Sequence, residues 1–571
     1  MAAALMLGIA FMSWRLVDLQ VNQAPELQKR AIAQQQAQLR PFIPRRSIVD
    51  RHSLVNQEAE LLAVDRPVYT LWAHPTLFKN HRPDEIAPKL APILKVSSES
   101  LWERLNTSQN SAIRLERWVP VEVADQIRTL YIDGLELVSE RQRIYPQKEM
   151  VAEVIGYVDL DHEGQAGLEY AHQQLLERTL KPVTIPRDGY GYPLAAEVPE
   201  KLLQSGETVL QTTLDMRLQR AARTALKVQM DRFQALRGSV IVMAPQTGEI
   251  LAMASEPTYD PNRYYDGYSP SLFRNWAVTD LYEPGSTFKP INIALALDAA
   301  VIEPDTTVYD QGQIYVGGWP IQNYDFDQRG AHGWMLVGDV MKQSSNVGMV
   351  HLMDRLNPER YYQGLLSLGM NSPTGVDLPF EPASQLKSRR QFTTVPIEAA
   401  TTSFGQGFSL TPLGLTSIHC VLANGGFKIT PHVVKGLVET NSGETIWQPS
   451  RPEPIRVLSE TTTRTVRTQM RDVVEYGTGR SAYLEGYEIG GKTGTAQKAS
   501  PQGGYIKGKR ITSFVGYFPA LKPDYVILAV VDEPKGDDAY GSSVAAPIVR
   551  SVIEEIIAMN GVMPQTTSPL P

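Results

Sequence analysis

The stretch "LYEPGSTFKP", residues 281 to 290, leads directly into the apolar run "INIALALDAAVI", which has the composition of a buried helix. Pro284 and Gly285 interrupt the chain before this run. The stretch therefore predicts that Ser286 lies in the first turn of the helix, where its backbone N–H has no intrahelical partner. Pro290 agrees with this placement, because proline has no N–H and is tolerated only in the first turn of a helix.

Lys289 follows Ser286 at a spacing of three, which puts both side chains on one face of the expected helix. A neutral lysine amine there can take the hydroxyl proton and make the serine a nucleophile. For the amine to be neutral near physiological pH, apolar surroundings or a second cation must lower its pKa. The segment predicts Ser286 as catalytic nucleophile and Lys289 as its base.

The same spacing recurs in "SQLK", Ser384 to Lys387, so the motif alone does not identify a site. This copy lies in "FEPASQLKSRRQF", with a proline before it and two arginines after it, and no apolar helix follows. Such a segment is typical of a solvated loop. The context therefore favours Ser286 over Ser384.

A second group lies in "MKQSSNVGMV", where Ser344 and Asn346 form a Ser-x-Asn turn between two apolar stretches. A hydroxyl at this turn can relay protons, and an amide can hold a carbonyl. A helix cap is an equally good interpretation when the motif is taken alone. The similar "SQN", residues 108–110, is expected to be a polar loop in another domain.

"GYEIGGKTGTAQK" supplies a third group, Lys492, Thr493, Gly494 and Thr495, shortly before a β-rich run. At a strand edge, lysine and threonine can bind a carboxylate, while Gly494 lets an extended peptide approach as an added strand. The Thr495 amide is a candidate oxyanion donor, paired with the free N–H of Ser286.

The same segment also fits a phosphate-binding loop, since Gly486 to Thr493 matches G-x-x-x-x-G-K-[ST] and "VILAVVDE" ends in Asp532 and Glu533. This alternative requires a strand before the loop and a helix after it. No β-rich run precedes Gly486, and "GTAQKASPQGGYIKGKR" is too rich in Gly and Pro for that helix. We therefore expect no ATP or GTP binding.

The order of helical and strand-like segments predicts an α+β fold. A short strand and a long amphipathic helix in "GETVLQTTLDMRLQRAARTALKVQM" indicate that a domain, residues 206–562, begins there. "GSVIVMAPQTGEILAMAS" and the distant "ITSFVGYFPALKPDYVILAVVDEP" each predict a pair of buried strands. Because mainly helical segments separate them, we expect one antiparallel sheet with helices on its faces.

The remaining segments differ in composition and in the structure they predict. Residues 1–22 begin with the apolar "MAAALMLGIAFMSW", which we interpret as a membrane anchor whose first residues are missing, with a removed signal or a buried helix as alternatives. The Gln- and Ala-rich residues 23–40 predict a helical connector. Residues 41–205 predict an irregular α+β domain, and residues 563–571 are expected to be disordered.

Composition excludes some functions. The chain has 571 residues, which suggests two or three domains, and a net charge of −7, which does not favour nucleic-acid binding. Its single cysteine, Cys420, lies among apolar residues and is expected to be buried and inert. Asp159, Asp161 and Glu163 could ligate a cation, but such clusters are more often turns. No metal or cofactor is predicted.

Ser-x-x-Lys, Ser-x-Asn and Lys-Thr-Gly, in this order, resemble the three motifs of penicillin-binding proteins. The resemblance covers residues 206–558 and implies a penicillin-recognising, serine β-lactamase-like transpeptidase fold. It implies these roles: acylated nucleophile Ser286, base Lys289, proton relay Ser344, substrate anchor Asn346, and Lys492, Thr493, Gly494 and Thr495 around the substrate carboxylate and oxyanion.

The first domain resembles the elongated pedestal of class B, monofunctional members, through "RRSIVDRHSLV", "RIYP", "GYV" and "GQAGLE". It departs from them at Ser47, His52 and Ser53, where the family usually has Arg-Gly and Asp-Arg-Asn-Gly. The turn there is therefore expected to differ. "YEPGSTFKP" and "GKTGTAQK" are more similar to the division-type subgroup than to the elongation type.

The resemblance implies a peptidoglycan D,D-transpeptidase in which Ser286 attacks the D-Ala-D-Ala carbonyl, D-alanine leaves, and an amine of a second stem peptide resolves the acyl-enzyme. β-Lactam antibiotics should trap the first step. The alternatives are a D,D-carboxypeptidase or β-lactamase, in which water resolves the acyl-enzyme, and a non-enzymatic β-lactam sensor. The family also implies septal wall synthesis, a single-pass protein of the cytoplasmic membrane with an extracytoplasmic catalytic domain, and a polytopic glycan polymerase and other division proteins as partners.

Overall fold

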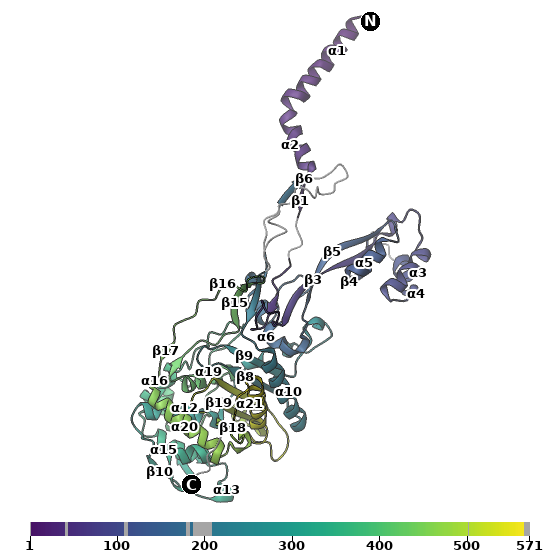
Figure 1. The fold of residues 1–571 in the computed structure, drawn as a ribbon. Coiled ribbons are helices and arrows are strands. Elements are labelled where there is room, and N and C mark those ends of the chain that lie inside the picture. The colour runs from purple at the N-terminus through teal and green to yellow at the C-terminus, as the bar shows by residue number, and fades with distance from the viewer. Residues whose placement is uncertain are drawn as a thin grey trace. The chain divides into compact units, whose positions relative to one another are not determined.

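A computed structural model describes residues 2–39, 44–107, 112–178, 183–186, 208–500 and 502–564 (Figure 1). The chain divides into two compact units. The first comprises Met1–Arg46, Arg66–Gln142 and Glu177–Glu207. The second comprises Ser47–Asp65, Arg143–Leu176 and Thr208–Pro571. The expected loop at residues 108–110 and residues 565–571 of the expected disordered tail lie outside the described residues.

The first unit begins with helix α1 (Ala2–Val17), the π-helical turn η1 (Asp18–Asn22) and helix α2 (Ala24–Gln35). Within the described residues, no helix combines the length and the apolar character needed to cross a membrane. The expectation of a helix over residues 23–40 is wrong for residues 36–39. These form strand β1 (Gln36–Leu39), because their backbone groups pair with strand β6 (Val183–Pro186) instead of with the preceding helical turn.

A small α+β lobe in the same unit has its own hydrophobic core. The stretch "PDEIAPKLAPIL" forms α3 (Pro83–Leu94), and its buried residues Ile86, Ala87 and Leu90 lie on one face of the helix. The other elements of this lobe are η2 (Pro75–Leu77), α4 (Ser98–Thr107), β4 (Ile113–Val119), α5 (Val121–Arg128), β5 (Leu135–Ile144) and the second part of β3 (Leu61–Ala73).

An antiparallel sheet of five strands lies at the centre of the second unit, in the order β18, β19, β20, β8 and β9 (Figure 1). The strands are β18 (Gly490–Ala499), β19 (Tyr505–Phe518), β20 (Tyr525–Asp532), β8 (Arg237–Met243) and β9 (Ile250–Glu256). Every neighbouring pair is antiparallel. Two strand pairs that are distant in the sequence thus join in one sheet, which confirms the prediction.

Both faces of this sheet are buried, because successive side chains of a strand point to opposite faces. In β8, Val240 and Val242 pack in a cluster with α10 (Met216–Phe233) and α21 (Ala545–Asn560). Ile241 and Met243 pack in the cluster on the other face. The long helices of that second cluster are α12 (Lys289–Asp298), α15 (Asn346–Met353), α16 (Pro358–Ser367), α19 (Pro412–Ala423) and α20 (Glu460–Tyr476).

A second sheet in this unit contains β16 (Thr445–Trp447), β15 (Val434–Glu439), β7 (Thr208–Thr212), β2 (Ile48–Val49) and the first part of β3. The segments that resemble the pedestal meet beside it. Arg143 of "RIYP" donates a 2.7 Å hydrogen bond to Glu169 of "GQAGLE", and the Val158 amide of "GYV" donates one of 2.9 Å to the Tyr145 hydroxyl.

His52, one of the residues at which the chain departs from the family pattern, lies in an ionic cluster at the start of α10. Its Nδ1 is 2.6 Å from Asp50 Oδ2, and its Nε2 is 3.0 Å from Nη2 of Arg217. The carboxylate of Asp215 accepts a hydrogen bond from the Arg217 amide and caps the helix. The imidazole thus ties the turn to this helix.

Shorter elements complete the second unit. The remaining α-helices are α6 (Ala152–Ile155), α7 (Gly167–Ala171), α8 (Gln173–Leu176), α11 (Trp276–Thr279), α13 (Phe326–Arg329), α14 (Val337–Gln343), α17 (Arg389–Thr394) and α18 (Pro396–Ser403). The 3-10 turns are η3 (Lys148–Val151), η5 (Pro261–Arg263), η6 (Pro270–Phe273), η7 (Gly285–Phe288) and η8 (Arg480–Ala482). Three two-stranded ladders pair β10 (Thr307–Asp310) with β13 (Gly333–Leu336), β11 (Gln313–Val316) with β12 (Trp319–Gln322), and β14 (Phe427–Lys428) with β17 (Ile455–Arg456).

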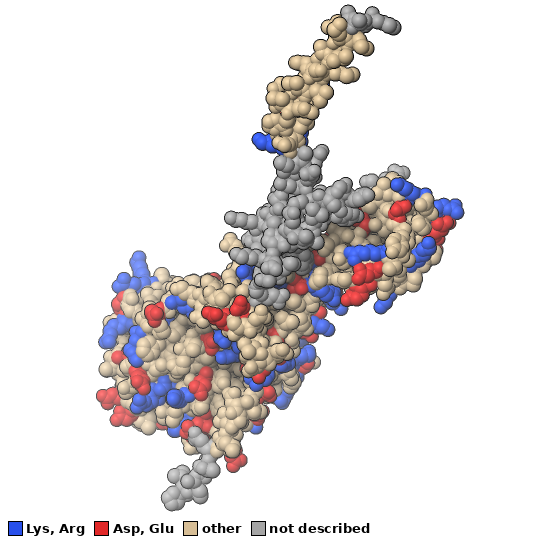
Figure 2. Space-filling model, turned by 45° about the horizontal axis from the view of Figure 1, so that its top comes forward, with Lys and Arg blue, Asp and Glu red and all other residues tan. Residues whose placement is uncertain are grey.

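Two minor predictions concern single features of this unit. Cys420 is fully buried in α19, as expected, and burial raises the pKa of its thiol. The carboxylate of Asp159 accepts hydrogen bonds from the backbone amides of Asp161 and Glu163, as in a polar turn. On the face shown in Figure 2, basic and acidic side chains are interspersed over the second unit.

Candidate active site

The turn that carries Ser286 is η7, a single 3-10 turn that continues directly into α12. Gly285 adopts a φ of +59°, and its amide donates a 2.9 Å hydrogen bond to the carbonyl of Gly405. Ser286 is half-buried, and its carbonyl accepts from the Lys289 amide. The predicted position of Ser286 in the first turn is confirmed.

His419 of α19 supports this turn from within the core. Its Nε2 lies 2.9 Å from the carbonyl oxygen of Thr287, and its Nδ1 lies 2.7 Å from the hydroxyl of Tyr517. Burial lowers the pKa of His419 to about 4, so the imidazole is neutral at physiological pH. The neutral ring donates through one nitrogen and accepts through the other, which fits these two partners.

Strand β18, the edge strand of the five-stranded sheet, lies against η7. A Cβ on Gly494 would lie 2.4 Å from Oγ of Ser513 on the neighbouring strand, 3.0 Å from Cγ2 of Thr287 and 3.1 Å from the carbonyl oxygen of Pro284. Glycine at this position therefore leaves room for the turn that carries Ser286. The sequence alone does not reveal this reason for a glycine at position 494. Thr495, the next residue, is exposed, and its hydroxyl accepts a 3.1 Å hydrogen bond from the amide of Gly541.

Lys289 is fully buried, and its amine points toward the Ser-x-Asn turn. Nζ donates to the carbonyl oxygen of Ser344 at 2.5 Å, to Oδ1 of Asn346 at 2.8 Å and to Oγ of Ser344 at 3.2 Å. Among the residues that the structure describes, Ser286 is not a hydrogen-bond partner of this amine. The sequence spacing places Lys289 close to Ser286 along the chain, but the hydrogen bonds of its amine go to Ser344 and Asn346 of the second motif.

Lys492 is the second buried amine of the site. Its Nζ donates to Oγ of Ser344 at 2.9 Å, to the Thr493 carbonyl at 3.0 Å and to the Thr493 hydroxyl at 3.3 Å. The Thr493 hydroxyl in turn donates to Oγ1 of Thr478 at 3.1 Å. The third motif is thereby connected to the second through one serine hydroxyl.

Both lysines have lowered pKa values. Burial, reinforced by the charge of Lys492, holds the pKa of Lys289 well below its usual range, while the carboxylates of Asp310 and Asp325 act in the opposite direction. Burial lowers the pKa of Lys492 to about 7. A neutral amine at Lys289 is what general-base catalysis requires.

The Ser-x-Asn turn contacts both lysines and also contains the N-cap of the next helix. Ser344 ends α14 with a φ of +60°, an uncommon conformation for a residue with a side chain, and presents its hydroxyl to both lysines. Ser345 is the N-cap of α15, and its hydroxyl accepts from the Gly348 amide at 2.8 Å. The side-chain amide of Asn346 donates to the carbonyl of Gln322 at 3.0 Å.

The structure adds residues that sequence reasoning missed. Thr478 follows α20, and its amide donates to the carbonyl of Lys342 at 3.1 Å while its hydroxyl reaches Thr493. Asp310 and Asn323 lie beneath the Ser-x-Asn turn and hydrogen-bond to it. No local pattern marks these residues, because each acts through a partner that is distant in the sequence.

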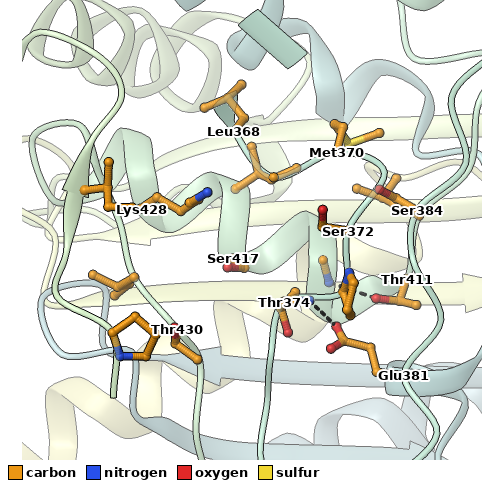
Figure 3. A pocket seen from close by; sticks show the side chains of 18 of the residues that line it. Leu368, Met370, Ser372, Thr374, Glu381, Ser384, Thr411, Ser417, Lys428 and Thr430 are labelled. Atoms are coloured by element: carbon orange, nitrogen blue, oxygen red, sulfur yellow. Dashed lines mark hydrogen bonds between the residues drawn. The ribbon is translucent and has the colours of Figure 1, made fainter. Parts of the chain in front are cut away.

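The rival segments have other structures. The "SQLK" copy is a loop in which the hydroxyl of Ser384 accepts a 2.8 Å hydrogen bond from the Asn371 amide. Ser384, Glu381 and Lys428 line a cavity of about 120 Å³ that none of the predicted site residues borders (Figure 3). Lys492 and Thr493 lie on a strand that continues to Ala499, so the helix that a phosphate-binding loop requires is absent after Thr493.

A serine at the start of a helix, two buried amines around a second serine, and an edge strand beside them occur here on an antiparallel sheet covered by helices. Together they define a serine enzyme of the penicillin-recognising, acyl-transferring class. The comparison with known families agrees. The "Penicillin binding protein transpeptidase domain" matches residues 238–554, and the "Penicillin-binding Protein dimerisation domain" matches residues 44–207.

Relatives match along nearly the whole chain. A "Peptidoglycan D,D-transpeptidase FtsI homolog" of Mesostigma viride is 40% identical over 98% of this chain and 94% of its own length. The protein of the same name from Chlorokybus atmophyticus is 35% identical over 98% and 95%. The crystal structure of penicillin-binding protein 3 from Mycobacterium tuberculosis complexed with ampicillin has a TM-score of 0.65, 29% identity, and coverage of 76% of this chain and 92% of that chain. The chain therefore belongs to the class B penicillin-binding proteins.

Proposed function

We propose that Ser286 is the acylated residue of a peptidoglycan D,D-transpeptidase that acts in cell division. The observation that supports this most directly is that Ser344 Oγ contacts two buried amines, those of Lys289 and Lys492. Lys289 is the first residue of α12, the helix that directly follows the turn with Ser286. The relatives named as peptidoglycan D,D-transpeptidases, which cover this chain almost completely, support the reaction and its substrate.

In the acylation step, the hydroxyl oxygen of Ser286 attacks the carbonyl carbon of the penultimate D-alanine, and its proton passes to neutral Lys289. The peptide C–N bond then breaks. Ser344 transfers a proton from the lysine to the leaving nitrogen, so that D-alanine departs with a neutral amine and Ser286 holds an ester. In the second step, an amine of another stem peptide attacks this ester, loses a proton along the same path, and returns Ser286 to its hydroxyl form.

The other predicted residues bind the substrate in this proposal. Asn346 holds a backbone carbonyl of the donor peptide, and Lys492 and Thr493 hold its terminal carboxylate. The amides of Ser286 and Thr495 stabilise the oxyanion. The exposed position of Thr495 on an edge strand supports this arrangement, because an extended peptide can pair there as an added strand.

β-Lactam antibiotics bind this class of protein covalently, and the similar protein of Mycobacterium tuberculosis has been crystallised with ampicillin and with aztreonam. Labelling with fluorescent penicillin, followed by mass spectrometry of the digested adduct, tests the assignment. The adduct is expected on Ser286 and not on Ser344 or Ser384. Ser344→Ala should fold and acylate ~100- to 10,000-fold more slowly, as expected for a lost proton-transfer group. An adduct on Ser384 would show that the nucleophile lies in the other Ser-x-x-Lys copy and that the assignment of Ser286 is wrong.

The lifetime of the acyl-enzyme separates the transpeptidase from its alternatives. A D,D-carboxypeptidase or a β-lactamase uses water to resolve the ester, whereas a transpeptidase waits for an amine. We expect the penicillin adduct to persist, as followed by loss of fluorescence from the isolated protein. Turnover within seconds would refute the transpeptidase in favour of a hydrolase. A sensor is refuted if cross-linked dimers form from purified pentapeptide substrate.

We further propose that residues 1–22 anchor the protein in the cytoplasmic membrane and that a polytopic glycan polymerase and other division proteins are its partners. The support is that every large apolar side chain described from Leu5 to Val17 is more than half exposed. The anchored protein should remain with membranes in high salt and dissolve in detergent. Release by salt alone would count against the anchor, and deletion of residues 2–22 should yield a soluble protein.

A further inference from the structure

A buried carboxylate lies beneath the Ser-x-Asn turn. Asp310, at the end of β10, is fully buried. Its Oδ2 accepts a 2.5 Å hydrogen bond from the Ser345 hydroxyl, and Oδ1 accepts one of 2.7 Å from the Gly312 amide. The side-chain amide of Asn323 donates to both oxygens, at 3.0 and 2.8 Å. These hydrogen bonds hold the loop that contains Asp310 and fix the side chains of Asn323 and Ser345.

Asn323 links the Asp310 carboxylate to the backbone of the turn through its side-chain amide. It is 1% exposed, and because its side-chain nitrogen donates to Asp310, its Oδ1 must face the opposite way. Oδ1 accepts from the amides of Asn346 at 2.8 Å and Val347 at 3.1 Å. These are N–H groups of the first turn of α15, which have no partner within the helix. Asp310 therefore sets the orientation of the amide that holds the start of α15.

The turn needs external support because its conformation is not a relaxed one. Ser344 has a φ of +60°, a left-handed conformation that is unfavourable for a residue with a Cβ atom. Its carbonyl and hydroxyl, together with Asn346 Oδ1, are the hydrogen-bond partners of the Lys289 amine. A shift of the turn would move every one of these atoms relative to the base.

We propose that Asp310 and Asn323 are positioning residues for acylation: they hold Ser344 and Asn346 in the conformation in which both contact Lys289. This inference rests on the proposed role of Ser286 and Lys289, and it assigns a function to the β10–β12 region that the three motifs do not include. Both residues are buried, so their effect on the reaction is transmitted through the turn and through charge.

The charge of Asp310 predicts an effect on the pH dependence of acylation, which a purely structural role would not produce. The charged groups that act on Lys289 are Lys492, which lowers its pKa, and Asp310 and Asp325, which raise it. Asp325 also lies 3.2 Å from Nε2 of His332. Loss of the Asp310 charge therefore lowers the pKa of Lys289, so the neutral amine persists to lower pH and the acid limb of the acylation profile moves down in pH.

Four variants of the full chain separate these effects. Asp310→Asn removes the charge and disturbs the bonds, and Asn323→Ala removes the bonds to α15 while leaving the charge. Ser345→Ala removes one bond to Asp310 and the N-cap of α15. Asp327→Asn is the matched control, because Asp327 lies on the neighbouring helix α13 and is exposed. Stopped-flow acylation by a chromogenic cephalosporin is measured against pH, after circular dichroism has shown each variant to be folded.

We expect the maximal acylation rate to fall ~10- to 100-fold in Asp310→Asn and Asn323→Ala, the scale of a misplaced catalytic group. Asp310→Asn alone should also move the acid limb to lower pH, and Asp327→Asn should change neither quantity. If Asp310→Asn does not fold, Asn323→Ala and Ser345→Ala still test the positioning. Wild-type maximal rates in Asn323→Ala and Ser345→Ala, or an unmoved acid limb in a folded Asp310→Asn, would overturn the inference. A wild-type protein that penicillin does not acylate at Ser286 would instead refute the proposed function.

Discussion

The buried amines of Lys289 and Lys492 share one hydrogen-bond partner, with their Nζ atoms 3.2 and 2.9 Å from Oγ of Ser344. A hydroxyl has two acceptor sites and one proton. Two ammonium groups this close in a buried site repel each other, so their proton occupancies are coupled. When one amine is neutral, the Ser344 proton can point to it while the other lysine donates to the oxygen. This geometry supports the proposed role of Ser344 as a proton relay between the two amines.

Lys289→Arg tests whether this lysine must lose its proton. Arginine stays charged at any pH at which a protein is folded, so it cannot act as a base. We expect acylation by penicillin to be lost almost as completely as in Lys289→Ala, although the positive charge is kept. Stopped-flow fluorescence measures the rates, and Lys387→Arg, in the second Ser-x-x-Lys copy, is the control. Acylation near the wild-type rate in Lys289→Arg would remove the amine from the role of base.

Lys492→Ala tests the influence of one amine on the other. The charge of Lys492 lowers the pKa of Lys289. Its removal raises that pKa, so a higher pH is needed to form the neutral amine, and the acid limb of the acylation profile moves to higher pH. The maximal rate also falls, because the carboxylate of the substrate loses its cation. Lys507→Ala removes an exposed charge from the neighbouring strand β19 and should leave the limb in place. An acid limb that moves down in Lys492→Ala would contradict this coupling.

Local sequence rules were sufficient to predict the turn that carries Ser286 and the helix that follows it. Pro284, Gly285 and Pro290 each act on the backbone within one turn, so the sequence alone indicates where the helix starts. The strands around Val240 and Leu528 were equally clear, because both faces of the sheet are buried and these strands are therefore continuous apolar runs. The antiparallel sheet with helices on both faces followed from the order of these segments.

Contacts between distant residues could not be predicted. Asp310 and Ser345 are hydrogen-bonded although 35 positions separate them, and nothing in the local pattern of either residue indicates the other. The direction of the Lys289 side chain could not be predicted either, since its spacing from Ser286 indicates the helix face but not the hydrogen-bond partner of the amine. At residues 36–39, the pairing with β6 overrode a helical composition, as tertiary contacts often do.

Gly405→Ala tests how closely the backbone of the catalytic turn is packed. A Cβ on Gly405 would lie 1.9 Å from the carbonyl oxygen of Gly285, next to Ser286, and Gly405 has a φ of +87°. Gly318→Ala is a matched control, because Gly318 has a φ of +85° with nothing within 4 Å of the added Cβ. The control should lose only the ~1–2 kcal/mol of the left-handed conformation.

In Gly405→Ala, the turn must move, so we expect a greater loss of unfolding free energy and an acylation rate lower by ~100-fold, the effect of a displacement of about 1 Å. Urea denaturation and penicillin acylation measure the two quantities. Equal losses of stability and rate in both variants would mean that the contact with Gly285 is unimportant.

Lys492→Met tests whether the buried amine that the reaction needs destabilises the fold. Burial lowers the pKa of Lys492 to about 7, whereas a lysine in the unfolded chain has a pKa near 10.4. Between about pH 10 and about pH 7, the unfolded chain therefore binds a proton that the native protein does not. The contribution of Lys492 to the unfolding free energy becomes less favourable as the pH falls through this window and stays constant below it.

Methionine has a similar volume and no charge, so Lys492→Met should abolish acylation but stabilise the protein by ~1–4 kcal/mol at neutral pH, as seen when buried charges are replaced by apolar groups. The gain should shrink as the pH approaches about 10, where the unfolded lysine also becomes neutral. Differential scanning calorimetry across this range measures the effect, with Lys507→Met as the control for an exposed lysine. A lower melting temperature than wild type at neutral pH would show that the hydrogen bonds of the Lys492 amine to Ser344 and Thr493 outweigh the cost of its burial. A difference that does not change with pH would show that folding does not lower the pKa of Lys492.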